Sequence, residues 1–286
     1  MSIEGQTVAV YGRHFLVVAD GSTLECISRG KKGGIACGDR VSLTPTEPGK
    51  GVIEQVLPRR NLLYRADEFR TKLIAANVDQ ALVVVAAVPG FREELLTRCL
   101  VACEAAGIPA VIVLNKTDLP ETAALADYLR HYTALGYGLI GVSARGDTLD
   151  LEASLRDRIS VLVGASGVGK STLLNRLIPD ANAITGDIST ALDAGKHTTT
   201  HTRLYRLPQG GDLLDSPGMQ EFSLGHLDEA SIKAGFPEIH ARAGQCRFYN
   251  CRHLKEPGCA ITEAVEAHEI IASRYRFYRD LIYSLA

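Results

Sequence analysis

The sequence predicts a multidomain α/β protein with three consecutive parts: a small β-barrel, a parallel sheet covered by helices, and a helical segment rich in cysteine and histidine. Three observations support this prediction. Short apolar segments crowd residues 6–58, apolar strands alternate with helical patterns from about residue 70, and Cys and His residues cluster after residue 245. The length of 286 residues also favours two or three domains.

The first part contains five short segments of apolar or alternating character, separated by turns with glycine or proline. The segments are 7–10, 15–18, 24–27, 40–43 and 51–56. Five short strands in this space predict a β-barrel of the OB-fold type, a fold that commonly binds oligonucleotides. Its basic loop contributes Arg29, Lys31 and Lys32, where we expect contacts with RNA phosphates. The alternative is another small barrel that serves only for packing.

From about residue 70, apolar strands alternate with helical patterns, which predicts a parallel sheet. Residues 81–88 form a continuous apolar run, as in a strand buried on both faces. Further strands are expected at 110–114, 138–142, 159–163, 205–207 and 212–214, and helices at 91–106, 121–135 and from residue 170. Residues 180–200 show no clear periodicity, and we expect a functional loop there. The chain becomes helical again over about 261–285.

The composition is that of a globular protein with a net charge of −2. The two ends of the chain are mildly basic and the middle is acidic. This distribution favours an anionic partner that contacts the ends. The alternative is ordinary variation of surface charge. No apolar run reaches the roughly 20 residues of a membrane span, and residues 1–10 lack a signal-peptide pattern. We therefore expect a cytoplasmic protein. Seven cysteines, an odd number, argue against a disulfide framework.

A phosphate-binding loop follows the strand at 159–163 and opens a helix. It matches the pattern G-x-x-x-x-G-K-[ST] and consists of Gly164, Ala165, Ser166, Gly167, Val168, Gly169, Lys170 and Ser171, with Thr172 directly after them. The glycines allow a tight turn whose backbone N–H groups face phosphates, and the helix N-terminus adds a favourable dipole. We expect Lys170 to reach the β- and γ-phosphates in binding and catalysis, and Ser171 to ligate Mg²⁺.

A guanine-recognition motif follows the strand at 110–114 and consists of Asn115, Lys116, Thr117 and Asp118. The Asp118 carboxylate can accept hydrogen bonds from N1–H and N2–H₂ of guanine, a donor pair that adenine lacks. Asn115 would brace neighbouring loops, and the Lys116 stem would cover the base. Asp118 could instead cap the next helix. Ser143 and Ala144 follow the next strand, where small side chains would let a backbone N–H approach guanine O6.

A D-x-x-G segment follows the strand at 212–214. Asp215 would reach Mg²⁺ through water and the Gly218 amide would meet the γ-phosphate, with a simple Pro-Gly turn as the alternative. Ras-like enzymes carry a water-orienting glutamine directly after this glycine. Met219 occupies that position here and Gln220 comes one residue later, so we expect slow intrinsic hydrolysis.

The sequence His-Thr-Thr-Thr-His ends the loop at 180–200 and contains two further candidates. Thr199 could ligate Mg²⁺ when GTP is bound. His197 could position or activate the attacking water, or it could be a solvated loop histidine.

Three cysteines and a histidine lie within a short polar segment: Cys246, Cys251, His253 and Cys259. Three thiolates and an imidazole form a closed tetrahedral zinc site, which stabilises the fold and leaves no open position for catalysis. The spacing is unlike that of a standard zinc finger. Free thiols are the alternative.

The order of the nucleotide motifs is unusual. In Ras-like GTPases the phosphate loop precedes the base motif, whereas here residues 115–118 lie upstream of residues 164–171. If both motifs function, the central part is a circularly permuted P-loop GTPase. The chain then runs from Gly218 toward the cysteine cluster with no return to the base motif. We therefore expect loss of the γ-phosphate to move the C-terminal part relative to the barrel.

Together these residues resemble the circularly permuted GTPases of small ribosomal subunit biogenesis, the RsgA family, also called YjeQ or EngC. The resemblance covers nearly the whole chain and includes Gly38-Asp39-Arg40-Val41 in the first part. It implies an OB domain over 1–68, a GTPase domain over 69–230 and a zinc-binding helical domain over 231–286. It also implies a factor that binds the small subunit and its rRNA in late maturation, with slow GTP hydrolysis that the subunit stimulates.

The resemblance further implies that the histidine matching His197 acts in hydrolysis, and we keep that residue as a candidate. We expect a monomer. Two other classes of function stay open from the sequence alone: an RNA-binding module that uses nucleotide only for stability, and an ATPase.

Overall fold

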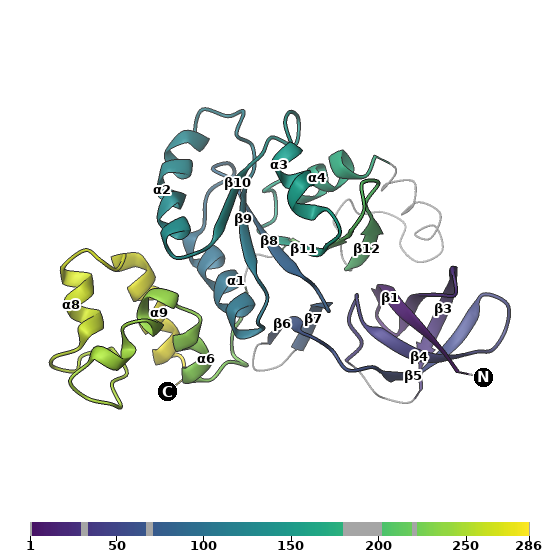
Figure 1. Cartoon of the computed structure of the whole chain (residues 1–286), viewed down its shortest axis with the longest axis horizontal. Helices are drawn as coiled ribbons and strands as arrows, with labels where there is room; N and C mark the ends of the chain where they lie inside the picture. Colours follow the sequence, from purple (N-terminus) through teal and green to yellow (C-terminus); the bar gives the residue numbers. More distant parts are fainter. Residues whose placement is uncertain (1, 30–33, 67–70, 180–201, 219–221, 286) are drawn as a thin grey trace.

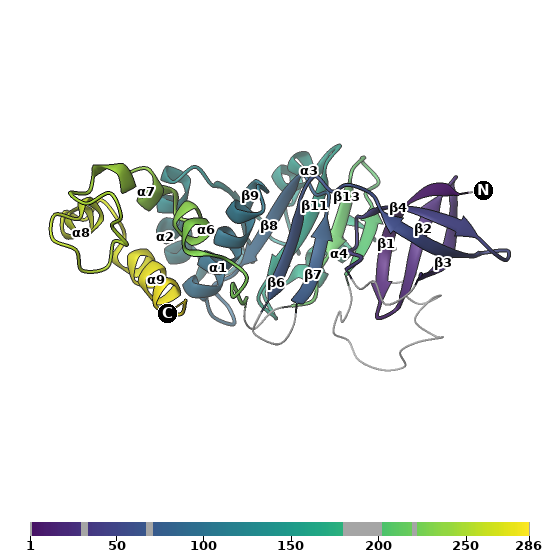
Figure 2. The same ribbon diagram turned by 90° about the horizontal axis from the view of Figure 1, so that it is seen from below.

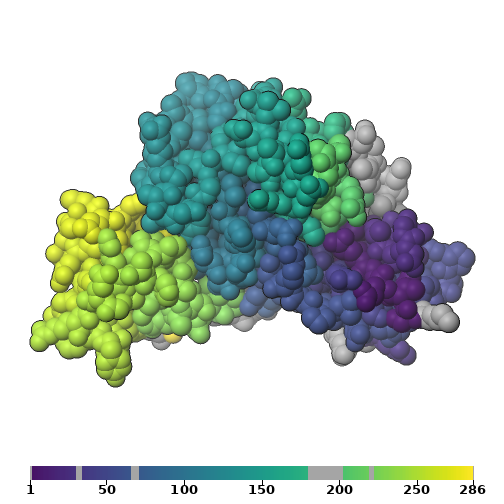
Figure 3. Space-filling model, in the orientation of Figure 1, coloured from purple at the N-terminus to yellow at the C-terminus, as the bar shows by residue number. Residues whose placement is uncertain are grey.

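The structure is a computed structural model that describes residues 2–29, 34–66, 71–179, 202–218 and 222–285. Figure 1 shows the barrel at one end of the molecule, the central sheet in the middle and the C-terminal helices at the other end. In the space-filling view these parts form adjoining lobes, and the lower edge between the two end lobes is concave (Figure 3).

Five strands form the N-terminal barrel. They are β1 (Ile3–Tyr11), β2 (His14–Ala19), β3 (Ser22–Ser28), β4 (Arg40–Pro45) and β5 (Lys50–Val56). The strands follow the order β1-β2-β3-β5-β4, and β4 returns to pair with β1, which closes the barrel. Alternate side chains fill its interior, and Val17, Cys26 and Leu43 are completely buried there. The predicted OB-like barrel is confirmed.

A hairpin of β6 (Leu62–Ala66) and β7 (Thr71–Ala76) lies between the barrel and the central sheet. Figure 2 shows it across one side of the molecule. These strands are not predicted by the sequence pattern, because charged residues such as Arg65 and Lys72 interrupt their short apolar pattern. The expected boundary between residues 68 and 69 falls inside this hairpin.

The central sheet has six strands in the order β10-β9-β8-β11-β13-β12. They are β8 (Gln80–Val85), β9 (Ala110–Leu114), β10 (Gly138–Gly141), β11 (Ile159–Gly164), β12 (Arg203–Arg206) and β13 (Asp212–Asp215). All neighbours pair in parallel except β12, which is antiparallel to β13. Every residue of β8 is buried, as its continuous apolar run predicted. The edge strand β12 also touches β1 of the barrel, through the pair Ala9 and Arg203.

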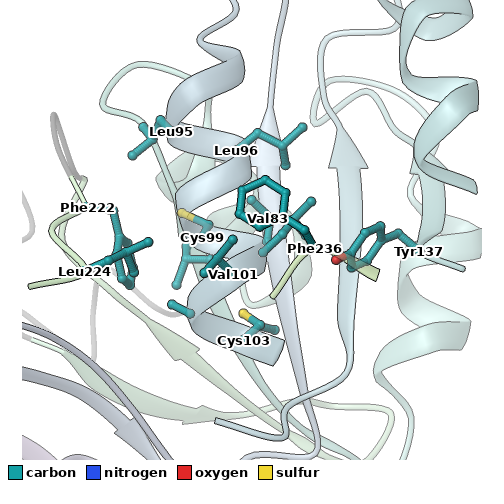
Figure 4. Packing of buried hydrophobic residues seen from close by; sticks show 14 of the residues in the cluster. Val83, Leu95, Leu96, Cys99, Val101, Cys103, Tyr137, Phe222, Leu224 and Phe236 are labelled. Carbon is teal, nitrogen blue, oxygen red and sulfur yellow. The ribbon is translucent and has the colours of Figure 1, made fainter. Parts of the chain in front are cut away.

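Helices cover both faces of this sheet. They are α1 (Glu93–Ala105), α2 (Thr122–Ala134), α3 (Leu149–Leu155) and α4 (Lys170–Leu177). The side chains of β8 alternate between the faces, so that Val83 packs with α1 while Leu82 and Val84 pack with α3 and α4. Figure 4 shows Val83 among Leu95, Leu96 and Cys99 of α1. Helix α3 is not predicted by the sequence pattern, because it is only about two turns long.

The C-terminal region consists of short helices that pack against α1 and α2. They are α6 (Glu229–Ala234), α7 (Pro237–His240), the 3₁₀ turn η1 (Ala243–Gln245), α8 (Ala260–Glu266) and α9 (Ala272–Tyr283). The helical stretch expected at 261–285 is therefore two helices. The chain breaks between them because His268 adopts a left-handed backbone conformation and Ile270 turns into the core.

Candidate functional site: a nucleotide site and a metal cluster

The nucleotide motifs meet at one edge of the central sheet. The base motif follows β9, Ser143 and Ala144 follow β10, the phosphate loop follows β11, and the D-x-x-G segment follows β13. Because these strands are parallel, their carboxyl ends share an edge, which is where open α/β sheets bind ligands. Segments that are about fifty residues apart in the sequence thus become neighbours.

The phosphate loop needs glycine at two positions where the chain approaches other groups closely. Gly164 has φ +145°, and a side chain there would collide with the backbone carbonyl of Val84. Gly169 has φ +100°, and a side chain there would collide with the Asn115 amide. Helix α4 begins directly after Gly169, so its N-terminal N–H groups point into the loop.

Lys170 lies inside this loop and is almost fully buried. Its ammonium group donates to the carbonyl oxygens of Gly164 at 2.9 Å and Ala165 at 2.8 Å. Burial lowers the pKa of Lys170, and the negative charge of Asp215 opposes that shift. The loop therefore holds a poorly solvated cation, which attracts anions more strongly than a solvated one.

The D-x-x-G segment runs beside the phosphate loop. A Cβ placed on Gly218 would be 3.1 Å from Cα of Ser166 and 3.4 Å from Nζ of Lys170. Asp215 is buried at the end of β13, and the Ser216 hydroxyl donates to the Leu162 carbonyl at 2.6 Å. The segment is therefore fixed against β11, the strand that carries the phosphate loop.

Asn115 connects the base motif to the phosphate loop. Its side-chain amide donates to the Val168 carbonyl at 2.9 Å, and its side-chain oxygen accepts from the Ala144 N–H at 3.2 Å. Lys116 adds a second connection, because its ammonium group donates to the carbonyl of Val88 at 2.8 Å and to that of Gly167 at 3.0 Å. The bracing expected of Asn115 is thus present in the geometry.

Asp118 lies exposed at the end of the base motif. The Ser143 hydroxyl donates to its carboxylate at 2.7 Å, and this hydrogen bond is the main reason why the pKa of Asp118 is lowered. Helix α2 begins at Thr122 with Glu121 in the capping position, so Asp118 does not cap it. The hydrogen bond between Ser143 and Asp118 could not be predicted from the sequence, because it depends on how β9 and β10 align.

The metal cluster lies in the C-terminal region. The ligand atoms of Cys246, Cys251, His253 and Cys259 all lie within 4.8 Å of one another. Cys246 Sγ is 3.4 Å from His253 Nδ1 and 4.0 Å from Cys259 Sγ. A tetrahedral zinc ion with bonds of about 2.3 Å to sulfur would separate two sulfur ligands by about 3.8 Å. The cluster therefore fits such an ion closely.

Neighbouring side chains hold the loop that carries the ligands. Burial by itself would raise the pKa of Glu256, but backbone N–H groups, among them those of Arg252 and Leu254, donate to its carboxylate and lower that pKa to about 2. The Tyr275 hydroxyl donates to the His253 carbonyl at 2.9 Å. Lys233 of α6 donates to the Cys251 carbonyl at 3.2 Å. Both α6 and α9 thus contact the metal cluster.

Some of the predicted residues fall outside the described part of the chain, and one lies on the barrel. The loop residues His197 and Thr199, Met219 and Gln220 after the D-x-x-G segment, and Lys31 and Lys32 of the barrel are outside the described residues. Arg29 is exposed on the barrel and pairs with Glu54 at 2.6 Å. Within the described part of the chain, no helix has the length and apolar character needed to cross a membrane.

Comparison with known proteins agrees with this geometry. The model of the RsgA GTPase family matches residues 56–225, which is more than half of the chain. The chain belongs to the RsgA GTPase family. It is therefore a GTP-hydrolysing enzyme, which removes the ATPase and the purely RNA-binding alternatives.

Curated relatives match over nearly the full length. The small ribosomal subunit biogenesis GTPase RsgA of Nitrosospira multiformis is 53% identical over 99% of this chain and 91% of its own. The protein of the same name from Burkholderia pseudomallei is 48% identical over 98% of this chain and 91% of its own.

Two solved structures of the family have the same fold. YjeQ from Thermotoga maritima has a TM-score of 0.76 at 32% identity and covers 100% of this chain and 99% of its own. YloQ, described as a circularly permuted GTPase, has a TM-score of 0.73 at 29% identity and covers 99% of this chain and 95% of its own. The predicted fold class, a barrel followed by a permuted GTPase core and a Cys/His-containing end, is confirmed.

Proposed function

We propose that this GTPase binds the small ribosomal subunit and its rRNA and acts in the late maturation of that subunit. The names of relatives that match nearly the whole chain at 48% and 53% identity support this proposal. The protein would act in the cytoplasm as a monomer. Its GTP hydrolysis would be slow alone and faster on the subunit.

We infer the nucleotide site from one observation above the others: Asn115 bonds to both Val168 and Ala144, so that base motif and phosphate loop form one connected site. The residues proposed to bind nucleotide are Asn115, Lys116, Thr117, Asp118, Ser143, Ala144, residues 164–172, Thr199, Asp215 and Gly218. The lowered pKa of Asp118 supports its role, because an ionised carboxylate accepts both guanine donors.

Lys170 would exchange acceptors when GTP binds. Phosphate oxygens would replace the carbonyls of Gly164 and Ala165, to which its ammonium group now donates. A cation that burial has already stripped of water would then meet the phosphate charge that grows in the transition state. Ser171 and Thr199 would hold the Mg²⁺ ion that accompanies GTP, and His197 is our candidate for the group that positions water.

The Cys/His cluster would hold one structural zinc ion through Cys246, Cys251, His253 and Cys259. Its four ligand atoms support a closed site that leaves no position for substrate. Native mass spectrometry before and after chelation measures the stoichiometry. The domains would be 1–68, 69–230 and 231–286, with RNA contacts of the barrel at Arg29, Lys31 and Lys32.

GTP turnover with and without purified small ribosomal subunits tests the proposal. We expect the subunits to accelerate multiple turnover on the order of tenfold or more, as partner proteins do for other slow GTPases. Lys170→Ala should abolish turnover under both conditions while circular dichroism stays unchanged. Equal wild-type rates with and without subunits would contradict the proposed stimulation.

A further inference from the structure

A buried threonine connects the base motif to helix α2. Thr122 is the first residue of this helix, and its relative exposure is 3%. Threonine side chains near a helix start often hydrogen-bond to backbone groups of the same helix. Here the Thr122 hydroxyl donates instead to the backbone carbonyl of Lys116 at 2.8 Å, which lies outside the helix and within the base motif.

The backbone of Lys116 needs support because its conformation is unusual. Its φ is +64°, in a region that residues other than glycine rarely occupy and that persists only where surrounding contacts hold it. The Lys116 carbonyl accepts two hydrogen bonds, from the Thr122 hydroxyl and from the Leu119 N–H at 3.0 Å. The bond from Leu119 closes the turn itself. The bond from Thr122 attaches this turn to a separate element.

Helix α2 is a firm point of attachment. Its residues Leu129 and Tyr132 are completely buried in the core cluster that also contains residues of α1. Figure 1 shows the helix beside β10 and β9. From the end of β10, the Val142 carbonyl accepts a hydrogen bond from the Thr117 N–H at 3.1 Å. The turn of the base motif is therefore held on one side by α2 and on the other by the end of β10.

This turn sets the direction of two side chains in the nucleotide site. The Lys116 ammonium group reaches the carbonyls of Val88 and Gly167, and the Asp118 carboxylate meets the Ser143 hydroxyl at 2.7 Å. A carboxylate that accepts from two donors of guanine at once tolerates little misplacement. A change in the direction of the turn would therefore weaken recognition of the base.

We propose that Thr122 is a positioning residue for guanine: its hydroxyl fixes the Lys116 carbonyl and thereby the direction in which Asp118 presents its carboxylate. The inference rests on the proposed nucleotide site. Thr122 acts through the backbone and does not itself touch the nucleotide. Its contribution concerns the base and not the phosphates, because the separate loop at 164–171 binds the phosphates.

Nucleotide affinities of the full, zinc-loaded chain test this role. Thr122→Val removes the hydroxyl and keeps the branched shape, and it should weaken binding of GTP and GDP by about 2- to 12-fold, the range for one hydrogen bond. Thr122→Ser keeps the hydroxyl and should bind within about twofold of wild type. Magnesium tripolyphosphate, which carries three phosphates and no base, should bind wild type and Thr122→Val equally. Competition against a fluorescent guanine nucleotide, corrected for its own affinity, measures these constants.

Thr148→Val is the matched control. Thr148 also has a relative exposure of 3%, lies at the start of a helix, and donates its hydroxyl to Glu152 at 2.6 Å. Its replacement should lower the melting temperature about as much as Thr122→Val and leave GTP affinity unchanged. In steady state, Thr122→Val should raise KM as it raises Kd and leave kcat at saturating GTP unchanged, because slow chemistry makes KM equal to Kd.

Unchanged GTP affinity of Thr122→Val overturns the proposal. An equal loss for tripolyphosphate, an equal loss in Thr148→Val, or a failure of Thr122→Ser to bind like wild type also overturns it, since each assigns the effect to general packing. Asp118→Ala tests the site separately. If Asp118→Ala keeps wild-type GTP affinity, the proposed base motif is wrong. If Asp118→Ala loses affinity and Thr122→Val does not, the site stands and only the role of Thr122 is removed.

Discussion

Gly169 is one of the residues at which the two nucleotide motifs come into contact. Its φ of +100° is unfavourable for other residues, and its missing side chain leaves room for the Asn115 amide, which bonds to the adjacent Val168 carbonyl. In a permuted chain, the base motif and the phosphate loop are not held together by sequence proximity. Their relative position depends on contacts of this kind.

We predict that Gly169→Ala weakens GTP binding on the order of tenfold or more. Its methyl group would displace Asn115 and disturb a site in which misplacement of about 1 Å is costly. Gly136→Ala is the matched control: Gly136 has φ +97° but no heavy atom within 4 Å of the added Cβ. It should cost about 1 kcal/mol of stability and leave GTP affinity intact. Isothermal titration measures both affinities, and equal values for the two variants would contradict this explanation.

At the scale of elements, the most consequential contact joins α9 to α2 and α7. Arg274 of α9 has 1% side-chain exposure and pairs with Glu238 of α7 at 2.5 Å. Its guanidinium also lies 5.1 Å from the centroid of the Tyr132 ring on α2 and 5.2 Å from that of the Phe236 ring. A single buried cation therefore joins the C-terminal helices to the GTPase core.

We predict that Arg274→Met destabilises the protein by about 3–5 kcal/mol, because it leaves the buried Glu238 carboxylate without its partner. Arg274→Met combined with Glu238→Leu should recover most of that loss, since an apolar pair leaves no charge to desolvate.

Arg242→Met is the control. It breaks a pair with Glu269 whose side chains are 32% and 57% exposed, and it should cost at most about 1 kcal/mol. Urea unfolding and amide exchange in α9 report the outcome; equal losses for both single variants argue against the buried pair as the anchor.

The elements show how far the sequence alone could lead. Residues 110–114 form the predicted strand, and residues 91–106 and 121–135 contain the predicted helices, because their periodicity is strong and their turns are marked. The nucleotide motifs lie at one edge of the sheet because the strands that precede them are parallel, as the alternation of strands and helices predicted. The hairpin β6–β7 was not predicted because charged residues interrupt its apolar pattern, and helix α3 was not predicted because it is short. The bond from Ser143 to Asp118 and the anchoring of Lys116 depend on tertiary packing, which no local pattern records.

At the scale of the whole molecule, both end regions attach to elements that flank the D-x-x-G segment. The barrel touches the central sheet through the pair Ala9 and Arg203 on β12, the neighbour of β13. On the other side, Phe222 and Leu224 insert into the core around α1, as Figure 4 shows, and α6 follows. Glu229 and Lys233 of α6 then contact Arg252 and the Cys251 carbonyl beside the metal cluster.

The C-terminal region and the barrel are attached to the GTPase core by contacts of different kinds. This difference indicates which part should move when the nucleotide changes. The C-terminal region is held by the buried Arg274 and by Ser273, whose hydroxyl donates to Glu93 of α1 at 2.9 Å.

In the described part of the chain, the barrel pairs with the sheet through Ala9 and Arg203, and the Asn77 side chain donates to the Gly38 carbonyl at 3.0 Å. The Ala76 N–H donates to the Cys37 carbonyl at 2.9 Å, and Cys37 packs into the core cluster beside α1. No buried ion pair joins the barrel to the sheet among these contacts. We therefore expect the GTPase core and the C-terminal region to move together, and the barrel to rotate against both.

Distances between three labels test this expectation. We choose Thr23 on the barrel, Asp150 on α3 and Glu266 on α8, all exposed, and introduce the labels as unnatural amino acids because thiol chemistry would attack Cys246. Between GDP and a non-hydrolysable GTP analogue, the distances from Thr23 to Asp150 and to Glu266 should both change, whereas the distance from Asp150 to Glu266 should stay constant. A change confined to the last pair would place the movement at α6 and α9 instead. Identical distributions in all three pairs would contradict the predicted movement, because the expected switch changes the position of the barrel relative to the rest of the molecule.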